Sequence, residues 1–328
     1  MSVMRFKYLL SLLCMIGVSC ITNAQAWEPT KDIEVIVAYK PGSGTDTGAR
    51  LLSSFAERFF KHKLVVKNVN GEDGTTRWNT LIKAKPDGYT IGFINLPTFA
   101  TQTLNSSIEM TDVVPICNHV TETSIVVVRA DSPYKTIRDL VEDAKSKGNL
   151  LASTNGFMAS NHTAAQLLAH SGGFDYIAVD CGGTSDQLKA LLNDEVQFTC
   201  VKVPDVVPLL QKTNPEIRIL ASFSEKRLKD YPEVPTLAEY GYYDKWYGSS
   251  RGIVAPKGIP NDVLQYYVKT FHAMMDDFEV ATAHRNANLA LDYKDNLNLE
   301  ATMLASVFFC KDIIPMIYKE EDLKKHGN

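Results

Sequence analysis

The sequence has 328 residues, a formal net charge of −4 and 45% hydrophobic residues. This length is enough for two lobes of ordinary domain size, each with its own core. A mildly acidic chain with dispersed charges and no basic block lacks the electrostatic footprint of a nucleic-acid-binding protein. We therefore expect a globular protein that binds no nucleic acid.

The N-terminal segment predicts export. Basic residues precede an apolar run over 9–18, and Ala24-Gln25-Ala26 supplies a small-x-small pattern. Because the run is too short to span a bilayer, we interpret residues 1–26 as a signal peptide cleaved after Ala26, which places the mature chain in the periplasm. Cys20, which follows a Val-Ser pair, leaves a lipoprotein anchor as the alternative.

Cleavage would leave 32 Lys and Arg against 38 Asp and Glu, a net charge of −6. The cysteines that remain are Cys117, Cys181, Cys200 and Cys310. Four cysteines are too few to staple a chain of this size, and no Cys-x-x-Cys pair or histidine spacing fits a metal. We expect buried thiols or one structural disulfide, with no metal and no cofactor.

The first element in the mature chain is an apolar strand over 33–39 that breaks at a Gly-rich turn and continues as an amphipathic helix. The unpaired N–H groups at the helix start and the positive end of its dipole form an anion site. Thr45 or Asp46 is expected to cap the helix. The candidate anion-binding residues here are Gly42, Ser43, Gly44, Thr45 and Asp46.

Nucleotides fit this turn poorly. No Gly-Lys-Ser/Thr follows, so no lysine reaches a phosphate, and Gly48 falls one residue late for a dinucleotide motif. The next strand, over 64–69, lacks the acidic residue that would bind a ribose. A tight turn between strand and helix, without a ligand, remains the structural alternative.

The strand–turn–helix unit recurs along the chain. Strands are expected over 150–154, 176–180, 196–200 and 217–221, and the first two enter polar turns rich in Gly, Ser, Thr and Asn. Alternating strands and helices predict an α/β fold with parallel sheets covered on both faces. Ligands bind such sheets at the carboxyl ends of the strands, where these turns lie.

The turns of the second set supply further candidates. Ser153, Thr154 and Asn155 end one strand, and Gly183 with Thr184 follow the next. Hydroxyl and amide donors here would face the first turn across a cleft, although helix capping also explains the composition. His162 near the next helix start is either a ligand contact or a packed structural residue.

The order of elements predicts two lobes joined by a hinge. Residues 27–124 and 248–328 would form lobe 1, and residues 125–247 lobe 2, with the ligand cleft between them. A C-terminal helix over 297–319, bent at Pro315, would return to cover lobe 1. Trp246 at the second crossing is expected either to wall the cleft or to pack in the core.

Catalysis has little support in the sequence. Cys181 with His162 as base is the one nucleophile hypothesis, and no third orienting residue accompanies the pair. The acidic residues in the turns are scattered at expected helix starts, where capping is their usual role. We expect a protein that is not an enzyme, with Cys181 as the alternative.

Several segments together resemble a known receptor family. Pro41-Gly42-Ser43-Gly44-Thr45-Asp46 resembles its Pro-Gly-Gly-Gly-Thr-Asp turn, and Lys85-Pro86-Asp87-Gly88-Tyr89-Thr90 its Pro-Asp-Gly-Tyr-Thr strand entry. Supporting matches are His162, residues 222–227, Val234-Pro235-Thr236, Trp246-Tyr247-Gly248 and residues 255–260. In this order, over nearly the whole mature chain, the sequence is similar to the Bug family, the extracytoplasmic solute receptors of tripartite tricarboxylate transporters.

The resemblance implies a two-lobed type II periplasmic binding protein fold with a hinge and an inter-lobe ligand cleft. Such a receptor, here expected as a monomer, captures a small organic carboxylate and delivers it to membrane permease subunits. The grip would come from the turn at Gly42 to Asp46 with Asn95 in lobe 1, and from Ser153 to Asn155 with Gly183 and Thr184 in lobe 2. A sensor protein as the receptor's partner is the alternative.

Departures from the family pattern leave ligand specificity open. Phe157 and Met158 enlarge a loop usually built from small residues, and Cys181 lies where the family commonly has other residues. Lys202 replaces part of a common Asp-Asn pair. It could pair with a second acidic group of the ligand, but we expect a solvated side chain.

Overall fold

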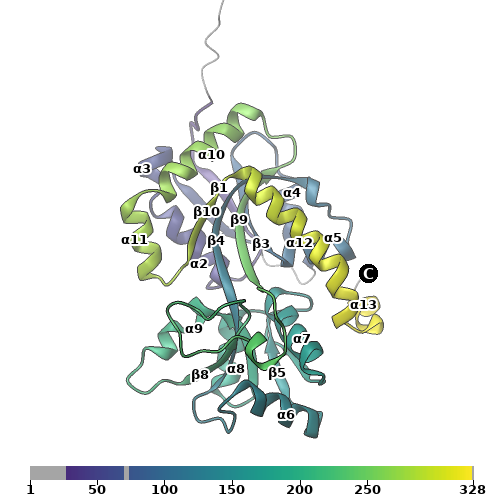
Figure 1. Cartoon of the computed structure of the whole chain (residues 1–328). Coiled ribbons are helices and arrows are strands. Elements are labelled where there is room, and N and C mark those ends of the chain that lie inside the picture. The colour runs from purple at the N-terminus through teal and green to yellow at the C-terminus, as the bar shows by residue number, and fades with distance from the viewer. Residues whose placement is uncertain (1–26, 70–73, 327–328) are drawn as a thin grey trace, which may run out of the picture.

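The computed structural model describes residues 27–69 and 74–326. The predicted signal peptide and the alternative anchor at Cys20 lie outside these residues. The described chain forms an upper and a lower lobe, and the long strand β4 (Val113–Arg129) runs from one into the other (Figure 1). The two-lobed α/β fold expected from the sequence is confirmed.

Lobe 1 is built on a sheet in which β2, β1 and β3 are parallel neighbours and β9 pairs antiparallel with both β3 and β4. These strands are β1 (Ile33–Val37), β2 (Leu64–Asn68), β3 (Thr90–Leu96) and β9 (Gly248–Pro256), with β10 (Leu291–Lys294) on β4. Buried side chains such as Val35, Leu52 and Phe271 form a core on one face. The helices are α2 (Gly44–Ser53), α3 (Ala56–Phe60), α4 (Gly74–Ile82), α5 (Thr98–Asn105), α10 (Asn261–Met275) and α11 (Phe278–Asn286).

Lobe 2 repeats the architecture around the second half of β4. The strands β5, β6 and β7 are parallel, whereas β4 pairs antiparallel with β7 and with β8. Their bounds are β5 (Leu151–Thr154), β6 (Ile177–Asp180), β7 (Phe198–Lys202) and β8 (Ile217–Ser222). The helices are α6 (Ile137–Lys147), α7 (Ser160–Gly172), α8 (Thr184–Leu192) and α9 (Val203–Leu210), and 3₁₀ turns occur at Met110–Asp112 and Ala238–Tyr240.

Both sheets are mixed, so the expectation of parallel sheets is only partly right. The parallel strands are those joined by crossover helices, whereas β4 and β9 run antiparallel because the chain crosses between the lobes and returns. Thr123 of β4 lies opposite Gly248 of β9 in lobe 1, and Ser124 lies opposite Lys202 in lobe 2. The division at residues 124 and 247 stays a prediction with which this pairing is consistent.

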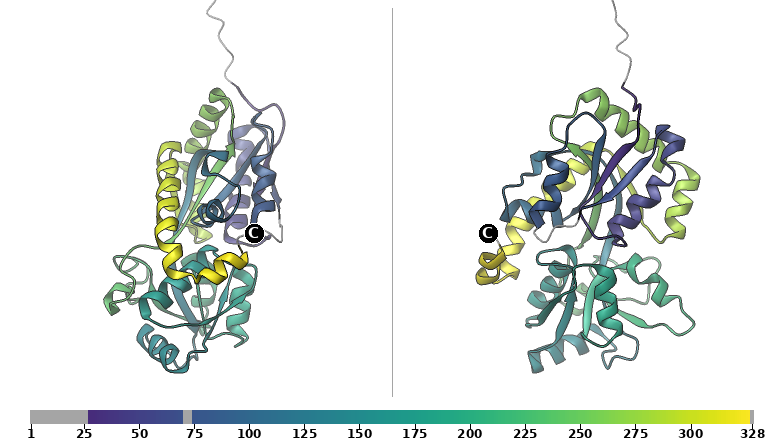
Figure 2. Two further views of the ribbon diagram at one scale, coloured as in Figure 1. Left: turned by 90° about the vertical axis from the view of Figure 1, so that its right-hand side faces the viewer. Right: turned by 180° about the vertical axis from the view of Figure 1, so that it is seen from behind.

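The C-terminal tail covers lobe 1 and reaches lobe 2. Helix α12 (Asn296–Ile317) contains Pro315 in its last turn and ends two residues later, followed by α13 (Glu320–His326) at the junction of the lobes (Figure 2). The Tyr318 hydroxyl lies 3.1 Å from that of Thr163 on α7. Within the described ranges, the structure contains no helix with the length and apolar composition that a membrane crossing requires.

A buried histidine pair joins β4 to α11 inside lobe 1. The Nε2 atoms of His119 and His284 are 2.7 Å apart, and Nδ1 of His284 lies 2.7 Å from the Val280 carbonyl. His284 therefore donates through Nδ1 and accepts through Nε2 from His119. Burial lowers the pKa of both imidazoles, and for His119 the neighbouring His284 and Arg251 lower it further. Both rings are neutral in the folded protein.

This pair predicts acid sensitivity. Below pH 6.5 both histidines become protonated in the unfolded chain but resist protonation in the folded protein. The free energy of unfolding therefore falls as pH decreases, by about 2–4 kcal/mol between pH 7 and pH 5. Urea unfolding at pH 7, 6 and 5 measures this slope, which the H119Q/H284Q double variant should reduce. The exposed His272 gives the control: H272Q should keep it.

Candidate functional site

The turn between β1 and α2, which we call the first turn, is held by hydrogen bonds within the protein. Asp46 accepts from Gly42 N–H at 2.8 Å, from Asn68 Nδ2 at 2.8 Å and from Arg50 Nε at 3.0 Å. Burial raises the pKa of Asp46, but these hydrogen bonds outweigh it and the pKa lies below its ordinary value. Asp46 is therefore a charged brace that shapes the turn, with its acceptor capacity used inside the protein.

Ser43, and not Thr45 or Asp46, caps helix α2. Its hydroxyl accepts from Asp46 N–H at 3.2 Å, and the helix begins at Gly44. The expected cap was wrong because the Asp46 side chain folds back onto Gly42. The N–H groups of Gly44 and Thr45, in the first turn of the helix, have no intrahelical acceptor. Together with the dipole of this ten-residue helix they give the turn a positive end, and its role in anion binding stays a prediction.

Three contacts bring turns of lobe 2 against lobe 1. Ser185 Oγ donates to the Gly42 carbonyl at 3.4 Å, and Ser160 N–H donates to Thr98 Oγ1 at 3.1 Å. Thr101 Oγ1 donates to the Met158 carbonyl at 3.2 Å. These contacts place the predicted turns of the two lobes beside each other, and a ligand cleft between them stays a prediction.

The turn after β5, which we call the second turn, contains some polar groups that are hydrogen-bonded within the protein and one that is not. Ser153 Oγ donates to the Gln187 carbonyl at 3.1 Å, so this hydroxyl is used in the core of lobe 2. Thr154 is buried at the end of β5, and the buried Asn155 Oδ1 has no hydrogen-bond partner among the described residues. His162 Nδ1 accepts from Met158 N–H at 3.2 Å, so its imidazole shapes this turn.

The third turn lies between β6 and α8. Gly183 is its N-cap, and Thr184 at the first helical position lies 3.3 Å from the Asn161 amide. Cys181 is half-buried, and burial, followed by the charges of Asp180 and Asp186, raises the pKa of its thiol. A raised pKa is the opposite of the activation that a nucleophile needs.

Between these turns, one face of the crossing strands forms what we call the polar floor. Opposed residues share a face of a sheet, as do residues two apart on a strand. The pairs are Asn95 with Arg251, Ser249 with Glu122, and Ser124 with Lys202. All six side chains are buried. Among the described residues, Asn95 Oδ1, Ser124 Oγ, Ser249 Oγ, Glu122 Oε1 and Arg251 Nε have no hydrogen-bond partner, and Glu122 Oε2 and Arg251 Nη1 have none beyond each other.

Arg251 is the centre of this floor. Its Nη1 forms an ion pair with Glu122 Oε2 at 2.6 Å, and both side chains are at least 95% buried. A Cβ built at Gly44 would lie 2.5 Å from Arg251 Nη2, so the guanidinium packs against the first turn where a side chain is missing. Burial raises the pKa of Glu122, although Arg251 opposes this effect.

The expectation that the Lys202 side chain is solvated was wrong. Its exposed fraction is 2%, and Nζ donates to Asn161 Oδ1 at 2.6 Å and lies 3.4 Å from Ser160 Oγ. Burial lowers its pKa to about 8, while the nearby Asp205 partly offsets the shift. Lys202 extends the polar floor toward the second turn.

Trp246 stands apart from this cluster. Its ring is 42% exposed and Nε1 donates to Thr123 Oγ1 at 3.1 Å, beside the strand crossing. Its neighbour Tyr247 is the aromatic residue that reaches the second turn, through Ser160. A role for Trp246 in ligand binding stays a prediction.

The structure thus brings together the predicted turns and adds residues that sequence reasoning missed. The additions are Thr98, Glu122, Asn161, Tyr247 and Arg251. One signal was available: both crossing segments interrupt an apolar strand with polar residues, at 121–124 and 249–251. The thirteen predicted site residues remain predictions as ligand contacts.

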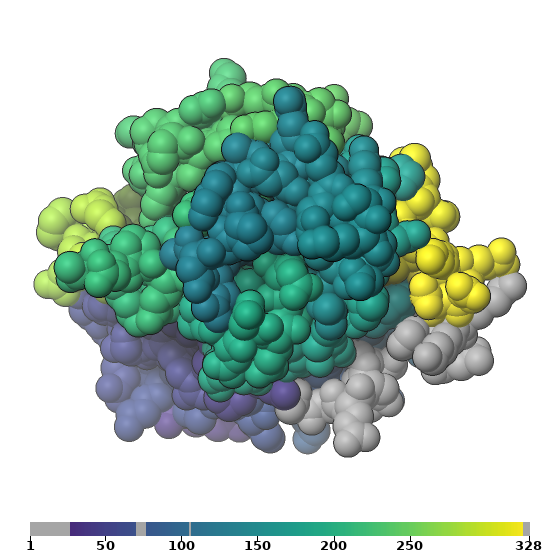
Figure 3. Space-filling model, turned by 90° about the horizontal axis from the view of Figure 1, so that it is seen from below, coloured from purple at the N-terminus to yellow at the C-terminus, as the bar shows by residue number. Residues whose placement is uncertain are grey.

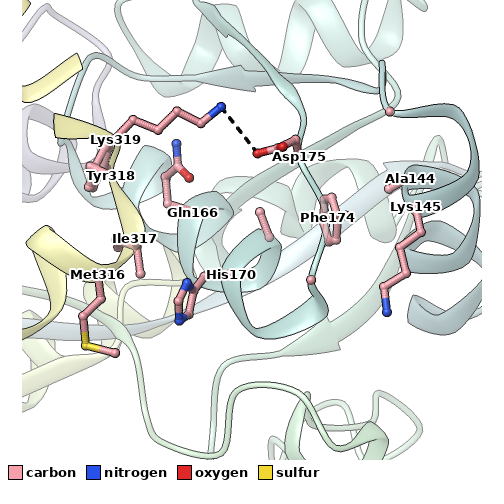
Figure 4. Close-up of a pocket in the computed structure, with 13 residues that line it drawn as sticks. Ala144, Lys145, Gln166, His170, Phe174, Asp175, Met316, Ile317, Tyr318 and Lys319 are labelled. Atoms are coloured by element: carbon pink, nitrogen blue, oxygen red, sulfur yellow. Dashed lines mark ion pairs between the residues drawn. The ribbon is translucent and has the colours of Figure 1, made fainter. Parts of the chain in front are cut away.

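Two neighbouring hollows lie at the end of α12. A cavity of 380 Å³ touches Thr154, Phe157 and His162 beside Tyr318. Next to it, a groove of 610 Å³ between α6, α7 and the end of α12 is crossed by the Lys319–Asp175 ion pair at 3.8 Å (Figure 4). Seen from below, the C-terminal residues lie at the flank of lobe 2 (Figure 3). The second groove includes none of the predicted site residues, so it is not the candidate site.

Comparison with known proteins identifies relatives along most of the chain. Residues 49–314 match the sequence model of a family described as the tripartite tricarboxylate transporter family receptor. The UPF0065 protein in the gbd 5' region of Cupriavidus necator is 29% identical over 252 residues, which is 76% of each chain.

Solved structures show the same fold. MatC from Rhodopseudomonas palustris with bound malate superposes with a TM-score of 0.81 at 21% identity, over 87% of this chain and 99% of that one. The periplasmic binding protein BugD superposes with a TM-score of 0.77 at 24% identity, over 91% of this chain and 98% of that one.

Proposed function

The chain belongs to the tripartite tricarboxylate transporter receptor family, and on that premise we propose that it captures a small organic carboxylate between its lobes. The mature receptor works in the periplasm as a monomer, after removal of residues 1–26, and delivers the ligand to membrane permease subunits. Its task is binding without catalysis. The malate bound to MatC supports a carboxylate as the ligand class.

One observation carries the proposal: the polar floor is buried, and several of its polar atoms have no hydrogen-bond partner among the described residues. Natural proteins pair nearly all buried polar groups with protein or water, and an unpaired group costs about 1–3 kcal/mol. Several such groups gathered between the ends of strands from both lobes are what a polar ligand and its waters would satisfy.

The chemistry of the floor and turns favours a carboxylate. Arg251 and the start of α2 both attract negative charge, and Lys202 adds a second cation across the floor. Hydrogen bonds from these donors to an ionised oxygen are stronger than neutral ones, and closure of the lobes shields them from water. We expect Gly44, Thr45 and Asn95 to contact the ligand from lobe 1, with Asn155 and Thr184 contacting it from lobe 2.

A thermal-shift panel tests the proposal. Protein stripped of endogenous ligand is heated with mono-, di- and tricarboxylates, with inorganic phosphate and with neutral sugars. At a hundredfold excess over Kd the right carboxylate adds about 2.7 kcal/mol, a rise in Tm of at least about 5 °C. If no carboxylate raises Tm, or if only phosphate does, the proposal is wrong.

A further inference from the structure

The Arg251–Glu122 pair lies beside a second positive feature. Arg251 Nη2 and Cζ would lie 2.5 Å and 3.1 Å from a Cβ at Gly44, so the guanidinium rests on the first residue of α2. The N-terminus of a helix carries a partial positive charge. Two positive groups packed together attract an anion, and in this structure the carboxylate of Glu122 plays that part.

Glu122 is a poorly supported partner. No described residue donates a hydrogen bond to either of its oxygens beyond the ion pair at 2.6 Å. Arg251 Nε likewise finds no hydrogen-bond acceptor among the described residues, and Nη1 finds none there beyond Glu122. A buried ion pair offsets its desolvation only when further hydrogen bonds satisfy both ions. Exchange of Glu122 for a better-held carboxylate is therefore favourable.

Charged and titratable groups on several packed elements face the pair. Glu122 faces Arg251 on β9, Lys202 at the end of β7 and Asp205 on α9. Arg251 also faces Tyr39 after β1 and His119 on β4. Burial raises the pKa of Glu122 and Arg251 opposes this effect, so withdrawal of Arg251 would leave the proton affinity of Glu122 higher still.

We propose that the carboxylate of the ligand replaces Glu122 as the partner of Arg251, and that Glu122 then takes up one proton from solvent. The inference rests on the proposed function, because it needs a carboxylate in the cleft. The contact of the Arg251 guanidinium with Glu122 is lost, its contact with the ligand forms, and an O–H bond forms on Glu122. The ligand brings one negative charge to Arg251 and the proton brings one positive charge, so the net charge around Arg251 is unchanged.

Charge balance is the physical reason for the proton. An additional unpaired carboxylate in a buried site costs several kcal/mol, and a buried acid avoids this cost by neutralisation. Ligand binding should therefore be tighter at lower pH over the range in which the ligand itself stays ionised. The protonated Glu122 can donate its new hydrogen to an acceptor in the polar floor, such as the unpartnered Ser124 or Ser249 hydroxyl.

Calorimetric titration at pH 7 tests the exchange. Malate, or the panel member with the largest thermal shift if malate gives none, is titrated in two buffers of different ionisation enthalpy. Wild-type protein should take up close to one proton per ligand. E122Q should take up close to none, with affinity equal to that of the wild type or up to about tenfold tighter. E239Q, which removes the carboxylate of the exposed Arg227–Glu239 pair, should behave as the wild type.

A double variant tests the role of Arg251 in ligand binding without leaving the Glu122 carboxylate unpaired. The E122Q/R251Q double variant has a neutral pair, and its Tm should lie close to that of E122Q while its affinity falls about 100-fold. Proton uptake retained in E122Q would assign the proton elsewhere, with Lys202 the nearest group, and overturn the exchange. Binding to the wild type without proton uptake overturns the exchange alone, whereas no binding to any carboxylate overturns the proposed function with it.

Discussion

Replacing Gly44 with valine is expected to weaken carboxylate binding about 100-fold while both lobes remain folded. A Cβ at this position would lie 2.5 Å from Arg251 Nη2, and the guanidinium is the movable end of a long side chain. The fold can therefore accommodate the change at a cost of about 1–2 kcal/mol. Ligand binding does not tolerate the change, because Arg251 is pushed off the start of α2 and the extra methyl groups cover the N–H groups that we expect to bind the anion.

G44V needs a control variant that loses a similar amount of stability but does not contact the cleft. Gly148 has a φ of +66° at the C-terminal end of α6, and no heavy atom lies within 4 Å of a Cβ built there. G148A should lose about 1 kcal/mol from backbone strain and bind as the wild type does. Calorimetry gives Kd and urea unfolding gives stability. A G44V protein with Kd within threefold of the wild type would contradict the assignment of the first turn.

Replacing Asp46 with alanine is expected to lower the free energy of unfolding by about 2–3 kcal/mol. The buried carboxylate accepts from Gly42 N–H, Asn68 Nδ2 and Arg50 Nε. Its removal leaves the Gly42 N–H without this acceptor and Asn68 Nδ2 with only the Tyr39 carbonyl. The half-exposed Arg50 can turn to water and adds little. Because the turn loses its brace, carboxylate affinity should fall as well.

Asp131 provides the matched control for this variant. It is an exposed carboxylate paired with Arg129, so D131A should leave the urea midpoint and Kd unchanged within error. If D46A unfolds at the wild-type urea concentration, Asp46 does not brace the turn. If it loses stability but binds carboxylates normally, the shape of this turn does not matter for binding.

The sequence predicted the parts of this molecule that depend on local chemistry. The recurring strand–turn–helix units, the polar turns at the strand ends and the family could all be recognised from short segments such as residues 41–46 and 85–90. Helix boundaries were less accurate. Ser43 caps α2 because Asp46, which was expected to cap it, instead bonds Gly42 and Asn68 across the turn.

Most of the polar floor was not predicted, although Asn95 was named as a site residue from the family resemblance. Asn95, Glu122, Lys202 and Arg251 come from four different strands, and they meet only because β4 and β9 cross between the lobes in a particular register. Each residue alone looks like an ordinary polar position in a strand. For the same reason Lys202 was expected in solvent: nothing local indicates that the turn containing Ser160 and Asn161 covers it.

The most direct test of the central claim asks whether the protein grips the carboxylate group itself. Stripped protein is titrated by calorimetry with the best carboxylate of the panel and with its primary amide, which has the same shape but no charge. The account predicts that the amide binds at least about 100-fold more weakly, because the start of α2 and Arg251 lose their anionic partner. Equal affinity for acid and amide would contradict it.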